Sequence, residues 1–297
     1  MTTPTPPRRI GLNWGQTFDV AKRAIAGFAR HDGGALAGYI AYSVLLAFFP
    51  FLIFAFKITG ILLGPYGATD MLSALFEYAP EHIALTLEPV VSEVLDQRTD
   101  GLLTISFLMT MFVASNAVEA FRTAFDRAYG FPEQKGMIRG RLTSMGFVLG
   151  GALVAAMLSL IIILGPLIIR QINTMSHSIG FDVPLGINAL RYFVGGVLFA
   201  GFLMAMHRLL PKHDLKITFL WRGVFVSVLL WVIAATLFSV YLSYAPSYTL
   251  TYGSIAGVIV TLLFFYITGA IIIFGAEVNA AIHGYERRQA LEELDEE

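Results

Sequence analysis

Cysteine is absent from this chain of 297 residues, and only 14% of the residues are charged. The lack of thiols excludes disulfides, thiolate metal ligands and cysteine nucleophiles. The low charge excludes an ordinary water-soluble domain, because 56% of the residues are hydrophobic and the mean hydropathy is +0.70. A soluble protein of this length needs far more polar surface than this composition supplies.

Motifs for nucleotide-driven or catalytic chemistry are also absent. The chain has no GxxxxGK[ST] loop, no GxGxxG turn and no GxSxG element. Its six histidines are scattered, without HxH or HExxH spacing, so we expect no metal site. We therefore expect no enzyme activity and no cofactor, and any transport would need a gradient or a partner as its energy source.

Long apolar segments are abundant. Six of them are close to or above the roughly 20 residues that a helix needs to cross a bilayer, at 36–63, 101–118, 145–169, 189–206, 218–244 and 252–282. We predict an all-α, polytopic integral membrane protein in which residues 1–297 form a single domain. Its fold would be a six-transmembrane-helix bundle with short amphipathic interfacial helices.

The distribution of lysine and arginine predicts the orientation, because cations near a membrane are retained in the cytoplasm. Of the 20 cations, 16 fall on the side that holds both termini. We expect 1–12 to be a disordered cytoplasmic tail, 64–100 a periplasmic loop with amphipathic helices, and 286–297 an acidic cytoplasmic tail. Membrane lipids are the expected partners, and the basic loops fit anionic lipid better than nucleic acid.

The segment before the first apolar stretch has its own helical pattern. Trp14, Phe18, Ala21, Ile25 and Phe28 recur at helical spacing, with Lys22, Arg23 and Arg30 among the polar positions. The pattern fits an interfacial helix on the cytoplasmic surface, and equally a helix docked on the rest of the protein.

Small residues and one proline mark the apolar segments. GxxxG pairs, which allow close helix packing, occur at Gly34/Gly38, Gly60/Gly64, Gly146/Gly150 and Gly253/Gly257. They fit packing within one bundle or within a homo-oligomer. Pro50 should kink the first segment, either as a hinge or as a fixed bend.

Ionisable residues at membrane depth are the main functional candidates, because each is costly there unless paired or hydrated. The candidate transport path comprises Lys57, Asn116, Glu119, Arg122, Glu277 and Asn279, and Glu119 can pair with Arg122 at i, i+3 spacing. Candidate outer contacts for an anionic headgroup are Lys57, Arg170 and Arg191. The alternatives are that these cations snorkel to the interface and that Glu277 makes a structural hydrogen bond.

The second half of the chain carries a more specific pattern. It comprises Met206-His207-Arg208-Leu209-Leu210-Pro211, Trp221-Arg222-Gly223, Tyr252-Gly253-Ser254 and Phe274-Gly275-Ala276-Glu277-Val278-Asn279. The chain thereby resembles the YihY/BrkB family of bacterial inner-membrane proteins. The resemblance makes Tyr252, Gly253, Gly275, Glu277 and Asn279 family-motif residues, whereas Phe265 stands before Tyr266 where the family usually has tryptophan.

The resemblance implies the inner (plasma) membrane, and envelope functions that include serum resistance and movement of a lipid A precursor. The family has also carried the label ribonuclease BN, which we judge to be a misassignment. Three hypotheses follow: a transporter or flippase for an envelope lipid or other amphiphile, a non-catalytic membrane scaffold, and, far below both, a membrane-associated ribonuclease.

Overall fold

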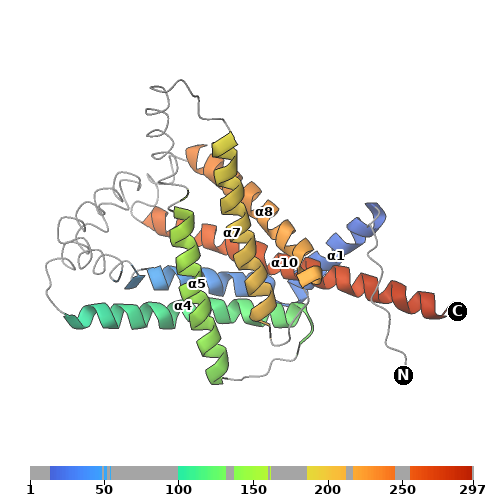
Figure 1. The fold of residues 1–297 in the computed structure, drawn as a ribbon, viewed down its shortest axis with the longest axis horizontal. Helices are drawn as coiled ribbons and strands as arrows, with labels where there is room; N and C mark the ends of the chain where they lie inside the picture. The colour runs from blue at the N-terminus through green and yellow to red at the C-terminus, as the bar shows by residue number, and fades with distance from the viewer. Residues whose placement is uncertain are drawn as a thin grey trace. The chain divides into compact units, whose positions relative to one another are not determined.

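The structure is a computed structural model that describes residues 14–48, 50–51, 54, 100–131, 137–159, 161, 186–211, 217–244 and 255–295. All regular secondary structure in these ranges is helical (Figure 1). The helices are α1 (Trp14–Arg30), an unlabelled helix over Gly33–Phe48, α4 (Asp100–Ala128), α5 (Met137–Ser159), α7 (Gly186–Leu209), α8 (Ile217–Tyr244) and α10 (Ile255–Asp295). The all-α prediction is therefore confirmed for the described residues.

Four apolar stretches are long enough to cross a membrane, and all match predicted segments: Thr104–Ala128, Leu190–Leu209, Phe219–Leu242 and Ala256–Arg288. Two shorter apolar helices, Gly33–Phe48 and Gly140–Ala155, overlap the predicted first and third segments. The count of six spans stays a prediction. The predicted tail 1–12 lies outside the described residues, and so does the predicted loop 64–100 except for Asp100, which begins α4.

The chain divides into two compact units, each assembled from separate stretches of sequence. The first contains Met1–Gly33, Arg122–Leu230 and Ile271–Glu297, and the second contains Gly34–Phe121 and Trp231–Ala270. The helix over Gly33–Phe48, α4, α8 and α10 all pass from one unit to the other. Whether 1–297 behaves as a single domain stays a prediction.

In the second unit, small residues bring two helices together. A Cβ on Gly269 of α10 would lie 3.4 Å from Ile40 and 3.5 Å from Ala37, both of which are buried. Nearby, the Trp231 indole donates to the Thr268 hydroxyl at 3.2 Å, and its ring packs edge-on against Phe264. The hydrogen bond satisfies a polar N–H that would be costly in an apolar surrounding.

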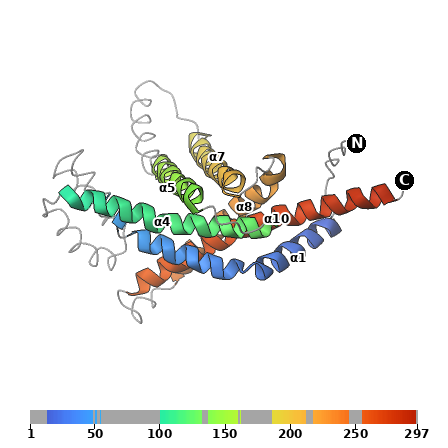
Figure 2. The ribbon, with the colours of Figure 1, turned by 90° about the horizontal axis from the view of Figure 1, so that it is seen from below.

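In the first unit, α5 packs against α7, and both α8 and α1 pack against α10. Helices α5 and α7 run side by side, with Phe147 packed against Phe202 (Figures 1 and 2). Helix α8 crosses α10 where Gly223 meets Gly275, and α1 lies along α10 beyond that crossing (Figure 2).

The two GxxxG pairs that the structure describes in full, Gly34/Gly38 and Gly146/Gly150, do not mark the closest of these approaches, and Gly60, Gly64 and Gly253 of the other two pairs lie outside the described residues. Among the described residues, no packed heavy atom lies within 4 Å of a Cβ built on Gly38 or Gly146. A Cβ on Gly223 would instead collide with the carbonyl oxygen of Gly275. The tight crossing is made by two glycines from different helices, which a spacing rule within one helix does not detect.

Candidate functional site

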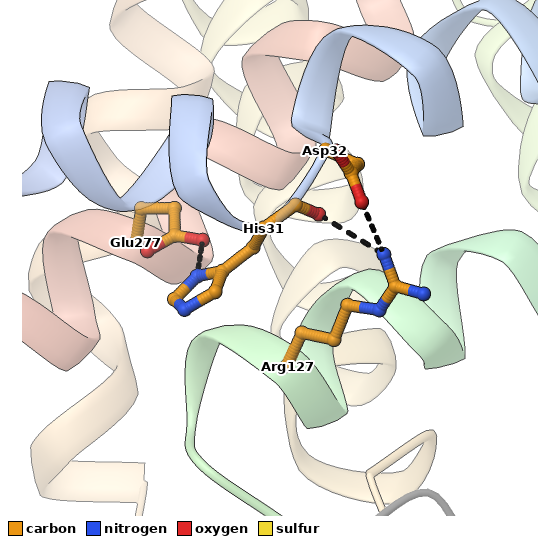
Figure 3. Close-up of polar contacts among 4 residues, drawn as sticks. All are labelled: His31, Asp32, Arg127 and Glu277. Atoms are coloured by element: carbon orange, nitrogen blue, oxygen red, sulfur yellow. Dashed lines mark hydrogen bonds and ion pairs between the residues drawn. The ribbon is translucent and has the colours of Figure 1, made fainter.

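Four polar side chains surround the turn that joins α1 to the helix over Gly33–Phe48. We call His31, Asp32, Arg127 and Glu277 the turn cluster. His31 Nδ1 lies 2.7 Å from Glu277 Oε1, and Arg127 Nη1 donates to Asp32 Oδ2 at 3.1 Å and to the His31 carbonyl at 3.4 Å (Figure 3). These contacts tie the turn to α10 on one side and to α4 on the other.

The backbone of the turn places both of its side chains. The His31 amide donates to the Gly27 carbonyl at 2.9 Å and so closes the last turn of α1. Asp32 follows with a φ of 58°, the left-handed conformation that commonly ends a helix. Aspartate tolerates this conformation better than most residues, because its short side chain finds local partners. The aspartate therefore ends the helix and also holds Arg127.

Glu277 is the most deeply placed acid in the turn cluster. Its side chain is 4% exposed, inside the apolar stretch Ala256–Arg288. A carboxylate there requires a hydrogen-bonded partner, and His31 supplies one from a position 246 residues away. Helix α1 makes room for the carboxylate with Gly27, because a Cβ at that position would collide with Glu277 Oε2.

Gly27→Ala is expected to push the Glu277 carboxylate away from His31 and to lower the free energy of unfolding by about 1–3 kcal/mol, the usual cost of overpacking. Thermal unfolding in detergent measures the loss. Gly15→Ala is the matched control, because it lies in the same helix with no packed atom within 4 Å of the new methyl. Both variants gain the helix propensity of alanine, so equal stabilities would contradict the predicted collision.

A second polar group lies at the same end of α10. Asn279 Oδ1 accepts from the Gly223 amide at 2.7 Å, and Asn279 Nδ2 donates to the Leu220 carbonyl at 3.0 Å and to the Tyr129 hydroxyl at 3.5 Å. Tyr129 in turn lies 2.8 Å from His207 Nδ1. We call Asn279, Tyr129 and His207 the amide network, and it links α10, α8, α7 and the end of α4.

The partners of Asn279 determine the protonation pattern along the amide network. The Gly223 amide is a donor and the Leu220 carbonyl an acceptor, so the orientation of the Asn279 amide is unambiguous. Asn279 then donates to the Tyr129 oxygen, which leaves the phenol to donate to His207 Nδ1. The opposite arrangement would leave two buried polar atoms unpaired instead of one, at about 1–3 kcal/mol each.

This pattern places a proton on His207 Nε2. The His207 side chain is fully buried and stacked on Phe125, with ring centroids 4.4 Å apart. Among the described residues, Nε2 has no acceptor. The amide network therefore ends in a buried N–H donor that can bind an oxygen atom.

Tyr129 is expected to make the protein sensitive to strongly alkaline pH. Burial raises the pKa of its phenol, with a smaller contribution from the negative charge of Glu277, and the hydrogen bond from Asn279 opposes the rise. The unfolded chain ionises this tyrosine above about pH 10, whereas the folded chain keeps the proton, so stability falls as pH rises. The stability advantage of wild type over Tyr129→Phe should shrink by about 1.4 kcal/mol between about pH 9 and about pH 11. Chemical denaturation measures both free energies of unfolding. A difference between wild type and Tyr129→Phe that stays constant over that pH range would contradict the raised pKa of Tyr129.

Arg122 and Arg222 each bridge helices of the first unit. Arg122 donates from Nε to the Leu210 carbonyl at 3.1 Å and from Nη2 to the Gly140 carbonyl at 2.9 Å and the Ser144 hydroxyl at 3.3 Å. It thereby joins α4 to α5 and to the end of α7. Arg222 of α8 pairs with Glu286 of α10 at 2.7 Å.

The predicted path residues are distributed over several places. Glu277 lies in the turn cluster, Asn279 in the amide network, and Arg122 among the carbonyls near α5. Asn116 and Glu119 are half-buried in the part of α4 that belongs to the second unit. Their role, and the predicted pairing of Glu119 with Arg122, stay predictions.

The predicted outer contacts and the hinge are only partly described. Lys57, Arg170, Tyr252 and Gly253 lie outside the described residues. Arg191 donates to the Tyr192 hydroxyl at 2.8 Å and stacks on its ring, while Nε and Nη1 are buried without an acceptor among the described residues. Pro50 is half-buried and helical. The headgroup and hinge roles are therefore untested.

Sequence reasoning did not select His31, Asp32, Arg127 or Tyr129. The available signal was their position, since all four lie at the ends of helices on the side predicted to be cytoplasmic. His31 also follows Gly27 by one helical turn, and Gly27 leaves the space that the Glu277 carboxylate occupies. In the part of the chain that the structure describes, no three His, Cys, Asp or Glu side chains converge on a possible metal site.

The apolar helices define the class of protein. Their outward faces expose large apolar side chains, such as Phe193 at 68%, Phe225 at 62% and Leu237 at 64%, and lipid is the solvent that suits such faces. The protein is therefore a helical membrane protein. A model of the Virulence factor BrkB family matches residues 24–297, and the chain belongs to that family.

Curated relatives agree with this class. The chain is 31% identical over 265 residues to the ribonuclease-like protein YfkH of Bacillus subtilis (strain 168), which covers 88% of this chain and 94% of that protein. It is 23% identical over 286 residues to a UPF0761 membrane protein of Aeromonas salmonicida (strain A449), covering 88% and 93% of the two chains. A UPF0761 membrane protein of Rhodospirillum centenum (strain ATCC 51521 / SW) is 24% identical over 289 residues, which span 93% of this chain and 60% of that protein. No solved structure shows a significant match.

Proposed function

We propose that this protein is a transporter or flippase-like protein of the bacterial inner membrane that moves an envelope lipid or similar amphiphile. The observation that supports this most is the buried Glu277 paired with His31 across the first unit. An ionisable residue within an apolar span is costly, and such residues commonly mark the path of a charged or polar group. On the predicted orientation, the pair lies at the cytoplasmic end of α10.

The amide network supplies a second feature that suits a lipid headgroup. His207 Nε2–H is a buried donor without an acceptor among the described residues. A phosphate or ester oxygen that entered the helix ends near α10 would satisfy it. Glu277 and His207 would then act on different parts of the cargo, the first through charge and the second through a neutral hydrogen bond.

The turn cluster also suggests how such a path would be controlled. His31 and Asp32 occupy the turn just before the helix over Gly33–Phe48, and both are held by side chains from other helices. Breaking the His31–Glu277 contact would release the turn from α10 while Arg127 still holds Asp32. We propose that the His31–Glu277 contact opens during transport.

A membrane scaffold is the second candidate function. Helix α10 continues to Asp295, beyond the apolar stretch that ends at Arg288, and it exposes Leu291 at 54%. At 1.5 Å per residue its 41 residues span about 60 Å, twice the hydrocarbon core. A projecting helix of this kind could recruit envelope machinery.

We also propose that the protein is not an enzyme, although one relative is named ribonuclease-like. Nuclease chemistry with metal ions needs clustered carboxylate or histidine ligands, and the described residues hold no such group. RNA cleavage by highly purified protein that is abolished by a chelator would overturn this proposal.

Lipid translocation by the purified wild-type protein in liposomes tests the transport proposal. Fluorescent anionic phospholipid and lipid A-like analogues would be followed from one leaflet to the other, with and without a proton gradient. A translocation rate clearly above that of protein-free liposomes supports a transporter. No translocation of any anionic lipid under either condition would favour the scaffold.

A further inference from the structure

Helix α1 has two apolar faces, and only one of them is packed. Val20 and Ala24 are 5% and 0% exposed and pack with Val278 and Ile282 of α10 (Figure 2). Phe28 adds an edge-on contact with Phe274, with ring centroids 6.4 Å apart. This face, together with the His31–Glu277 contact, holds α1 in one rotational setting against α10.

The second apolar face points away from α10. Phe18 is 71% exposed and Ile25 is 61% exposed. They are seven residues apart, close to two full turns, so they form one stripe, and exposed Ala21 lies between them. On a helix with about 100° per residue, Phe18 and Ile25 lie at least about a quarter turn from Val20 and Ala24. It therefore cannot be buried by the contact with α10.

The charges beside this stripe indicate its occupant. Lys22 and Arg30 are exposed and Arg23 is half-buried, against a single acid, Asp19, in the helix. An apolar stripe flanked by cations is complementary to an anionic lipid surface, where the apolar side chains enter the headgroup boundary and the cations meet phosphates. An exposed apolar patch beside charged residues commonly marks an interaction site.

The connection to the membrane points to the same partner. Helix α1 ends at Arg30, and the apolar helix over Gly33–Phe48 begins three residues later. Helix α1 is therefore held close to any membrane that this apolar helix would enter.

We infer that α1 docks on the anionic inner-leaflet surface through Phe18, Ile25 and Lys22, while its opposite face stays packed on α10. This surface is independent of the transport proposal, because a scaffold would use it equally well. When α1 is bound to lipid through this surface, it holds His31 at a defined distance from the membrane surface.

The absence of native cysteine makes a direct test possible, because any introduced cysteine is the only one in the chain. Nitroxide labels would be placed singly at Phe18→Cys and Ile25→Cys, with Asp19→Cys and Ala26→Cys as matched controls in the same helix. All four positions are exposed, so the substitutions leave the packed face intact. Electron paramagnetic resonance would then compare collision rates with oxygen and with a water-soluble nickel chelate in phosphatidylglycerol-containing and phosphatidylcholine-only liposomes.

The labels at positions 18 and 25 are expected to collide with oxygen and be shielded from nickel in anionic liposomes, while the labels at 19 and 26 stay open to nickel. Lys22→Gln, combined with either stripe label, should lower the ratio of docked to undocked α1 by about fivefold. This is the expected effect of removing one cation near an anionic surface. Nickel access at all four positions would overturn the inference. Shielding of the stripe from both oxygen and nickel would also overturn it, because a second copy or another protein would then cover the stripe.

Discussion

Glu277→Gln is expected to lower lipid translocation at least about tenfold, a change in barrier of about 1.4 kcal/mol, while the protein stays folded. Glutamine has nearly the same shape as glutamate and can still accept from His31 Nδ1, so the helix contact survives. What is lost is the negative charge opposite His31. A hydrogen bond to a charged group contributes about 1.5–3 kcal/mol and a neutral one about 0.5–1.5, so the stability loss should be about 1 kcal/mol.

Glu286→Gln is the matched control for this variant. Glu286 lies in the same helix, is paired with Arg222 at 2.7 Å and has a side chain 18% exposed, but it has no contact with the turn cluster in the described structure. Its replacement should leave translocation within about twofold of wild type, the scatter expected for a change that does not touch the turn cluster. Equal losses of translocation in Glu277→Gln and Glu286→Gln would show that transport depends on the total charge of α10 and not on the position of Glu277.

A double-mutant cycle isolates the pair itself. If His31 and Glu277 act together, His31→Gln and Glu277→Gln should each impair translocation, and the double variant should be no worse than the poorer single one. Additive losses would show two independent roles. Size-exclusion profiles that match wild type are needed for all three variants, so that a folding defect is not counted as a transport defect.

Gly223→Ala is expected to destabilise the protein by about 3 kcal/mol, the upper end of the usual overpacking cost. The new methyl would collide with the backbone carbonyl of Gly275, which cannot rotate away as a side chain can. It would also press on the Asn279 side chain, whose Oδ1 accepts from the Gly223 amide at 2.7 Å. Loss of that contact would disturb the whole amide network.

The corresponding change on the other helix should be partly reversible. A methyl on Gly275 would collide with the Ser227 hydroxyl, which is a side-chain atom, and would also lie 2.8 Å from the Gly223 carbonyl oxygen. Gly275→Ala combined with Ser227→Gly should therefore recover part of the stability that Gly275→Ala alone loses. Gly284→Ala in α10 is the control, with no packed atom within 4 Å of the new methyl. Heat stability in detergent that is the same for Gly223→Ala and Gly284→Ala would contradict the described crossing.

The long apolar helices were predictable from the sequence, because they depend on composition over a long stretch of residues. Four of the predicted apolar segments coincide with long apolar helices, because a run of about 20 apolar residues has few alternatives to a span. The family was also predictable, since the Gly275, Glu277 and Asn279 motif is local in sequence. Glu277 and Asn279 were chosen for their depth, and both are buried polar residues in the structure.

The face by which α1 packs on α10 was harder to predict from the sequence. The stripe of Phe18, Ala21 and Ile25 was the more conspicuous pattern, yet Val20 and Ala24 make the contact with α10. Both faces are apolar, so helical periodicity alone does not decide which face packs against α10. Phe18 and Ile25 lie on the exposed face, whereas Phe28 of the same predicted pattern contacts Phe274 on the packed side.

The sequence by itself determined that this protein is a helical membrane protein, where its four long apolar helices lie and which family it belongs to, because these depend on local composition and short motifs. The tertiary structure alone decided which polar groups meet. His31 and Glu277 are separated by 246 residues, and Tyr129 and Asn279 by 150. A helical pattern defines which residues share a face but not which helix will lie against it. Contacts across such distances depend on how several helices pack at once, and at Gly27, Gly223 and Gly275 that packing depends on the absence of a single methyl group.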